Sequence, residues 1–133
     1  METVERVIEY LDKVHSYNLA TVENGKPHVR VFGTALLYDG KLYIQSGKKK
    51  AIYKEILENP YAELCAWQGP EWMRVSGELV VDEDRDVKVA MLEKMPNLKA
   101  MYDPDDGNML MMYFKDATVT FNSFTTPTEW LHF

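Results

Sequence analysis

Two turn signals near the start of the chain restrict its fold more than any other feature. The segment "YNLATVENGKPHVRVFGTALLYDGKLYIQ" contains Asn24-Gly25 and Asp39-Gly40, and each pair separates two β-prone runs. Paired residues that tolerate positive φ are typical of two-residue hairpin turns. The sequence therefore predicts three antiparallel strands in tandem. They are expected over residues 17–23, 27–38 and 41–46.

The spacing of apolar residues predicts helices and further strands in the rest of the chain. Apolar residues recur at helical spacing over residues 2–15 and 83–95, and a short helix is expected to begin at the lysine run 48–50. Three more strands are expected over residues 61–68, 72–82 and 115–124. Tandem hairpins with inserted helices predict a mainly β fold with flanking helices, a six-stranded antiparallel barrel forming one domain over residues 1–133.

The charge and composition exclude several classes of protein. The net charge is −6 and the isoelectric point is near 5.0, which argues against general binding to nucleic acid or to a membrane surface. The single cysteine, Cys65, excludes an internal disulfide, and the three histidines are too scattered for a metal site. No apolar run is long enough to cross a membrane and the first residues are unlike a signal peptide, so a soluble cytoplasmic protein is expected.

The lysine run is the densest positive charge in this acidic chain. Lys48, Lys49 and Lys50 are predicted in the first turn of the short helix. That end of a helix carries partial positive charge and unpaired N–H groups, so cations there are unfavourable unless an anion binds. With Arg30 and Ser46 nearby, the groups suit a dianionic phosphate. A solvated basic turn without a ligand is the alternative that these residues leave open.

The strand over residues 27–38 has two chemically different faces, because alternate side chains point to opposite sides. One face carries His28, Arg30, Phe32 and Thr34, and the other carries Val29, Val31, Gly33 and Ala35. If the small apolar face points into the barrel, Arg30 lies outside it. It would then lie close to Gln45, Ser46 and the lysine helix.

Three blocks of the sequence resemble one known family. The blocks "ATVENGKPHVRVFG", "LYIQSGKKKAIYKEILENP" and "WMRVSGELVV" are similar, in order and spacing, to the pyridoxamine 5′-phosphate oxidase-like FMN-binding split barrels. The similarity covers residues 15–82 and continues more loosely to the C-terminus. It implies a six-stranded split barrel that forms a homodimer and holds FMN at the subunit interface.

The resemblance also implies which residues bind the cofactor. Those that would contact the flavin, its ribityl chain or the pocket around them are Arg30, Val31, Phe32, Ile44, Gln45 and Ser46. Lys49 and Lys50 would bind the FMN phosphate. Trp72 would reach the flavin from the partner subunit, and Trp130 would do so from the tail, with Trp67 a weaker candidate.

The C-terminal tail argues against one reaction of the family, the oxidation of pyridoxamine 5′-phosphate. Pyridoxamine phosphate oxidases bind their substrate through arginine and histidine residues in this region, but here the last arginine is Arg85, which argues against that reaction. The run "GPEWMRVSGE" resembles the Nim-type, nitroimidazole-resistance branch instead. The expected function is an FMN-dependent oxidoreductase that reduces a small nitro compound or quinone with NAD(P)H or another donor. A non-catalytic flavin-binding module, or the same barrel binding haem or a deazaflavin, is the alternative, and no catalytic residue is predicted.

Overall fold

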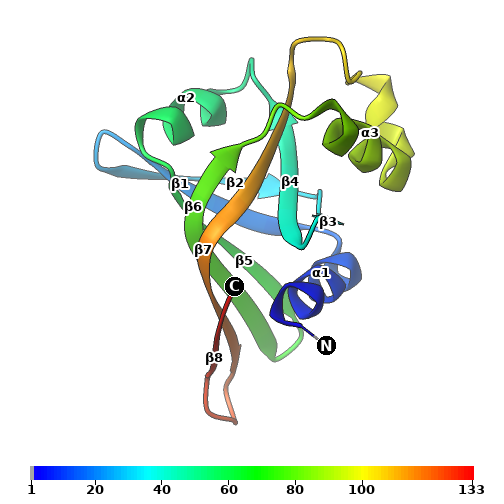
Figure 1. Cartoon of the computed structure of the whole chain (residues 1–133). Coiled ribbons are helices and arrows are strands. Elements are labelled where there is room, and N and C mark those ends of the chain that lie inside the picture. Colours follow the sequence, from blue (N-terminus) through cyan, green and yellow to red (C-terminus); the bar gives the residue numbers. More distant parts are fainter. Residues whose placement is uncertain (1) are drawn as a thin grey trace.

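The computed structural model describes residues 2–133 and contains strands, three α-helices and one 3-10 helix in that range (Figure 1). The helices are α1 (Thr3–Val14), α2 (Ala51–Glu58), α3 (Arg85–Lys94) and the 3-10 helix η1 (Pro96–Ala100). The strands are β1 (Tyr17–Glu23), β2 (Lys26–Phe32), β3 (Leu36–Tyr38), β4 (Lys41–Gly47), β5 (Tyr61–Gln68), β6 (Glu71–Val81), β7 (Met109–Ser123) and β8 (Glu129–His132).

The strands form one antiparallel sheet in the order β2-β1-β5-β6-β7-β4-β3, with β8 added beside β7. The sheet is strongly curved but not closed, because among the described residues β2 and β3 end the order without pairing with each other. Strand β7 has 15 residues and pairs in turn with β4, β6 and β8. This arrangement confirms the predicted split barrel of a mainly β protein with flanking helices.

The number of strands differs from the predicted six for two reasons. The strand expected over residues 27–38 is divided into β2 and β3, because the chain leaves β1 at Gly33 and crosses to the edge of β4. Thr34 fixes this crossing, since its Oγ1 accepts the Gln45 N–H at 2.9 Å and its main-chain oxygen accepts the Tyr17 hydroxyl at 2.7 Å. The tail, which was not predicted to be a strand, supplies β8.

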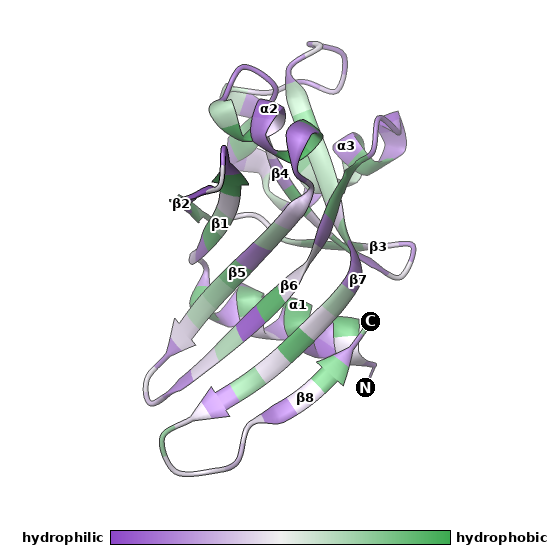
Figure 2. Ribbon diagram, turned by 90° about the vertical axis from the view of Figure 1, so that its left-hand side faces the viewer, coloured by the Kyte–Doolittle hydropathy of each residue, from purple (hydrophilic) through white to green (hydrophobic). Residues whose placement is uncertain are grey.

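Two apolar clusters hold the fold together. The larger one packs α1, through Val7 and Leu11, against the inner face of the sheet, and the smaller one packs α3 against the far side of β7. Apolar and polar residues alternate along β5 and β6, as expected for strands with one buried face (Figure 2). The methionine-rich start of β7 is buried on both faces: Leu110 and Met112 join the larger cluster, and Met109 and Met111 join the smaller one.

Helix α3 begins after a capping aspartate and ends before a proline. The side chain of Asp84 accepts the Asp86 N–H at 2.9 Å, so Asp84 is the N-cap of α3. Pro96 ends α3 and begins η1. No helix within residues 2–133 combines the length and apolar character that a membrane span requires.

Candidate functional site

A pocket of about 320 Å³ lies between β2, the end of β4 and the start of α2. The residues that line it are Arg30, Val31, Phe32, Ser46, Lys50, Ala51 and Ile52. All of them except Ala51 and Ile52 belong to the predicted cofactor-binding set. The fold therefore brings the arginine strand and the end of the lysine run to one place, although β2 and β4 are not paired in the sheet.

The lysines lie in a turn that precedes α2, not in its first helical turn as predicted. Gly47, Lys48, Lys49 and Lys50 form this lysine turn, which the Lys50 N–H closes by donating to the Gly47 oxygen at 3.0 Å. The chain needs these residues to reverse direction after β4, so the helix begins only at Ala51. Lys50 is the residue that precedes the helix, so the lysines still stand at its electropositive end.

The three lysines differ in their partners. Lys48 is half-buried and donates to the carboxylate of Glu83. Lys49 and Lys50 are exposed, and neither forms an ion pair within residues 2–133. The first turn of α2 has no acidic residue, so neither lysine is neutralised there, but only Lys50 lines the pocket; Lys49 is its neighbour in the turn.

Arg30 lies on the opposite side of β2 from the one expected. Val29 and Val31 are 65% and 70% exposed, whereas Phe32 is buried and Arg30 is half-buried toward α2. The prediction that the small apolar face points inward is therefore wrong. Burying the large aromatic ring of Phe32 removes more apolar surface from water than burying either valine, and Arg30 on the same face gains a buried partner, Glu55.

Arg30 forms a compact network with Thr21 and Glu55. Its Nη1 donates to Thr21 Oγ1 at 2.7 Å and its Nη2 donates to Glu55 Oε1 at 2.6 Å. The Thr21 hydroxyl donates to the same carboxylate. Burial raises the pKa of Glu55, but the hydrogen bonds from Thr21 and Arg30 and the charge of Arg30 outweigh it, so the pKa lies below its ordinary value. Glu55 is therefore ionised and balances the charge of Arg30, which lines the pocket.

Ile44 and Gln45 are not among the residues that line this pocket. Ile44 is fully buried in the larger apolar cluster. The Gln45 amide is also buried and its Nε2 donates to the Ser46 oxygen at 2.7 Å. Any contact of these two residues with a ligand would therefore involve main-chain atoms or a rearranged Gln45 side chain.

The predicted tryptophans lie far from the pocket within one chain. The start of β6 and the short strand β8 are at the opposite end of the molecule from α2 (Figure 1). Trp72 packs on Phe124 with ring centroids 5.0 Å apart, and Trp67 and Trp130 are largely exposed. A contact between a tryptophan and a ligand in the pocket thus requires a second copy of the chain.

Sequence reasoning missed four residues that shape the site: Thr21, Glu55, Glu83 and Asn108. Glu55 carries a signal in the sequence, because it falls between Ile52 and Ile56 on the apolar face of its helix, where a lone carboxylate needs a buried partner. The others gave no such signal. Within residues 2–133, no three histidine, cysteine, aspartate or glutamate side chains are grouped so that they could hold a metal ion.

Comparisons with known proteins identify the family. The family model described as pyridoxamine 5′-phosphate oxidase matches residues 3–120. The crystal structure of a NimC/NimA family protein from Clostridium acetobutylicum is 37% identical in sequence, with a TM-score of 0.93 over 97% of this chain and 91% of that chain. The chain therefore belongs to the pyridoxamine 5′-phosphate oxidase family of split barrels and, within it, groups with the NimC/NimA proteins.

More distant structures share the fold alone. A pyridoxamine 5′-phosphate oxidase-related, FMN-binding protein from Nostoc punctiforme is 14% identical, with a TM-score of 0.63 over 98% of this chain and 94% of that one. A haem-binding protein from Mycobacterium smegmatis is also 14% identical, with a TM-score of 0.72 over 99% of this chain and 59% of that one. No curated protein matches the sequence.

Proposed function

We propose that the chain binds FMN in the pocket beside α2 and acts as an FMN-dependent oxidoreductase toward a small organic acceptor, such as a nitro compound or a quinone, with NAD(P)H or another donor. When bound, FMN supplies the hydride and electron chemistry, and the protein supplies position and electrostatics. The observation that carries the proposal is a pair of lysines that form no ion pair within residues 2–133: Lys50 lines the Arg30 pocket and directly precedes α2, and Lys49 is its neighbour in the lysine turn.

The residues at the start of α2 fit a phosphate group. The N–H groups of Ala51 and Ile52, which line the pocket, are in the first turn of the helix, where no intrahelical acceptor exists. Two ammonium groups and the helix dipole add favourable charge for a dianion. Arg30 is already balanced by Glu55, so the lysines supply the net positive charge that the phosphate needs.

A second copy of the chain fits the outer face of the sheet. A continuous row of paired residues crosses six strands on this face: Val31, Asn18, Cys65, Arg74, Thr120 and Trp130. Val29, Val31, Trp67 and Trp130, all largely exposed, lie on the same face. Exposed valines and tryptophans that share one face of a sheet are typical of an interface, and a homodimer would bring tryptophans to the pocket at Val31.

The pocket residues favour a flavin over haem. Haem iron is usually held by a histidine, cysteine, methionine or tyrosine side chain, and none of these residues lines the pocket. A deazaflavin cofactor also carries phosphate and would use the same lysines. A flavin-binding module without enzymatic activity would use the same pocket and would differ only in lacking turnover.

The test is an absorbance spectrum of the purified protein, followed by mass spectrometry of the released chromophore. Flavin bands and a released mass equal to FMN are expected, whereas a Soret band would indicate haem. Turnover with NAD(P)H and a nitroaromatic compound or quinone then separates an enzyme from a binding module. Failure to retain FMN after reconstitution with an excess of it would overturn the proposal.

A further inference from the structure

Asn108 holds the backbone of the lysine turn from a distant part of the chain. Its main-chain oxygen accepts the Lys48 N–H at 2.7 Å, and its side-chain Oδ1 accepts the Lys49 N–H at 3.0 Å across 59 positions of sequence. Since the Lys50 N–H donates to Gly47, three successive N–H groups of the turn have acceptors within the protein. One residue therefore supplies two of the three bonds that fix this turn.

This bonding determines which N–H groups are left for a ligand. The N–H groups of Lys48, Lys49 and Lys50 already donate to acceptors within the protein, so they are not free for an incoming anion. Within residues 2–133, those of Ala51 and Ile52 have no acceptor. An anion at this site would therefore take two helix N–H groups together with the side chains of Lys49 and Lys50, whose positions depend on the turn.

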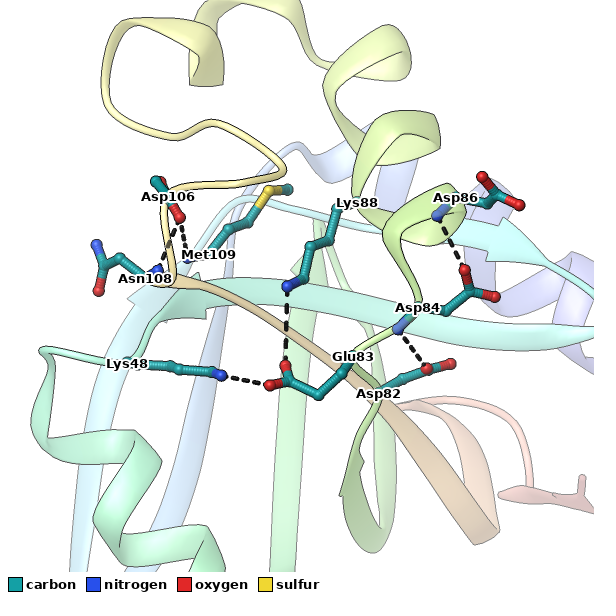
Figure 3. Close-up of polar contacts among 9 residues, drawn as sticks. All are labelled: Lys48, Asp82, Glu83, Asp84, Asp86, Lys88, Asp106, Asn108 and Met109. Carbon is teal, nitrogen blue, oxygen red and sulfur yellow. Dashed lines mark hydrogen bonds and ion pairs between the residues drawn. The ribbon is translucent and has the colours of Figure 1, made fainter.

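Asn108 directly precedes β7 and is itself held by a hydrogen bond to Asp106. Asp106 Oδ1 accepts the N–H groups of Asn108 at 2.7 Å and of Met109 at 2.8 Å (Figure 3). Met109 pairs with Gly47 in the sheet, which places Asn108 directly opposite the lysine turn. Gly47 adds a further constraint, because a Cβ there would lie only 2.9 Å from the Tyr102 hydroxyl oxygen.

The side chain of Lys48 is held by a separate contact. Glu83 lies between Lys48 and Lys88: it accepts a hydrogen bond from Lys48, and its Oε1 is 3.8 Å from Lys88 Nζ (Figure 3). Lys48 is thus directed toward α3, which leaves Lys49 and Lys50 as the lysines for the anion. Asn108 binds the backbone N–H groups of Lys48 and Lys49, and Lys50 follows directly in the same turn.

We propose that Asn108 is a positioning residue of the anion site. It does not bind the ligand but fixes the lysine turn, so that the ammonium groups of Lys49 and Lys50 and the first N–H groups of α2 converge on one phosphate. The inference rests on the proposed FMN function and deepens it, because it names a residue that sets how much the phosphate contributes to affinity. Riboflavin, which lacks the phosphate, is the matched ligand for the test.

Two substitutions at Asn108 change the site differently. Asn108→Ala removes the bond to the Lys49 N–H, so the affinity for FMN is expected to fall about fivefold, which corresponds to the loss of one hydrogen bond. Asn108→Asp keeps an acceptor but adds a negative charge near the phosphate, so FMN binding weakens by an amount that shrinks as salt is added. Riboflavin affinity is expected to change less than about twofold in both variants.

The experiment is fluorescence titration of the apoprotein with FMN and with riboflavin. Asn59→Ala is the control, since it removes an asparagine side chain that accepts the Tyr61 N–H at the other end of α2. A lower ratio of FMN to riboflavin affinity in Asn108→Ala, but not in Asn59→Ala, supports the inference. If the ratio of FMN to riboflavin affinity is unchanged in Asn108→Ala, including the case where both affinities fall equally, the inference is overturned. If the wild-type protein does not prefer FMN to riboflavin, the proposed function itself fails.

Discussion

Arg30, which lines the candidate pocket, forms an ion pair with Glu55 of α2, with Arg30 Nη2 2.6 Å from Glu55 Oε1. The carboxylate side chain is only 2% exposed and the guanidinium side chain 26% exposed, so the two charges are unequally hydrated. Thr21 donates to the same carboxylate oxygen. The network links β1, β2 and α2, so its charge state is expected to affect the stability of the fold.

Replacing Glu55 by glutamine is expected to lower the free energy of unfolding by about 1–3 kcal/mol at neutral pH, because the hydrogen bonds from Arg30 and Thr21 lose their charged acceptor. The folded-state pKa of Glu55 is depressed, so its contribution is complete above the unfolded-state value of 4.5 and is lost as the pH falls through the folded-state pKa. The difference between wild type and Glu55→Gln should therefore be constant near neutral pH and shrink in acid. Urea denaturation at a series of pH values measures it.

Glu58→Gln is the control for this experiment, because Glu58 is exposed at the end of the same helix and forms no ion pair within the described residues. Its free energy of unfolding is expected to stay within about 0.5 kcal/mol of wild type. A Glu55→Gln difference that persists unchanged at low pH would show that the charge of Glu55 does not stabilise the fold.

The double substitution of Lys49 and Lys50 by alanine is expected to weaken FMN binding on the order of 100-fold, since each lysine offers a charge-assisted bond to the phosphate. The affinity for riboflavin should change little. The unfolding temperature of the apoprotein should be unchanged or slightly higher, because two cations that repel each other are removed from a helix N-terminus. Titration calorimetry with both ligands measures these effects.

A second double variant controls for net charge. Lys26→Ala with Lys99→Ala removes the same charge at exposed positions in β2 and η1. If this variant loses as much FMN affinity as the Lys49 and Lys50 variant, the effect comes from the overall field of the protein and the phosphate assignment is wrong.

The fold was largely predictable because its turn chemistry is local. The Asn24-Gly25 and Asp39-Gly40 pairs adopt positive φ at all four residues, as the hairpin prediction required. The helices were equally predictable, because their apolar residues recur at helical spacing. The division of residues 27–38 was not predicted, because it depends on contacts of Thr34 with residues of β1 and β4 that no local pattern contains.

The candidate site was predictable only in part. Its residue types were found from the lysine run and from the family resemblance, and the fold places most of them in one pocket. The predicted direction of the Arg30 side chain was wrong, because alternation along a strand defines two faces without showing which one is buried. The buried partner of Arg30 is Glu55, which lies 25 positions away in the sequence. The role of Asn108 could not be read at all, since its partner lies 59 positions away and an isolated asparagine carries no pattern.

Gly77 lies where β6 changes register between Ser76 and Glu78, and alanine there is expected to be destabilising. A Cβ at Gly77 would lie 2.9 Å from the Lys115 oxygen and 3.2 Å from the Ala117 Cα, both backbone atoms of β7. The two strands would have to separate, which should cost about 1–3 kcal/mol in thermal or urea unfolding. Gly33→Ala is the control, because the nearest atom to a Cβ at Gly33 would be the His15 main-chain oxygen, 3.4 Å away. Equal stability of the two variants would contradict the close approach of β6 and β7.

Val31 lies on the outer face of the sheet that we propose forms the homodimer, and glutamate at this position is expected to disrupt that dimer. Burying an unpaired carboxylate in an apolar interface is unfavourable, so the dimer dissociation constant should rise on the order of 100-fold. Sedimentation velocity over a range of concentrations measures it. Leu57→Glu is the control, because Leu57 is 61% exposed but lies on α2, away from this face. A wild-type monomer that retains FMN would contradict the interface site, and a Val31→Glu dimer as tight as wild type would place the contact on another surface.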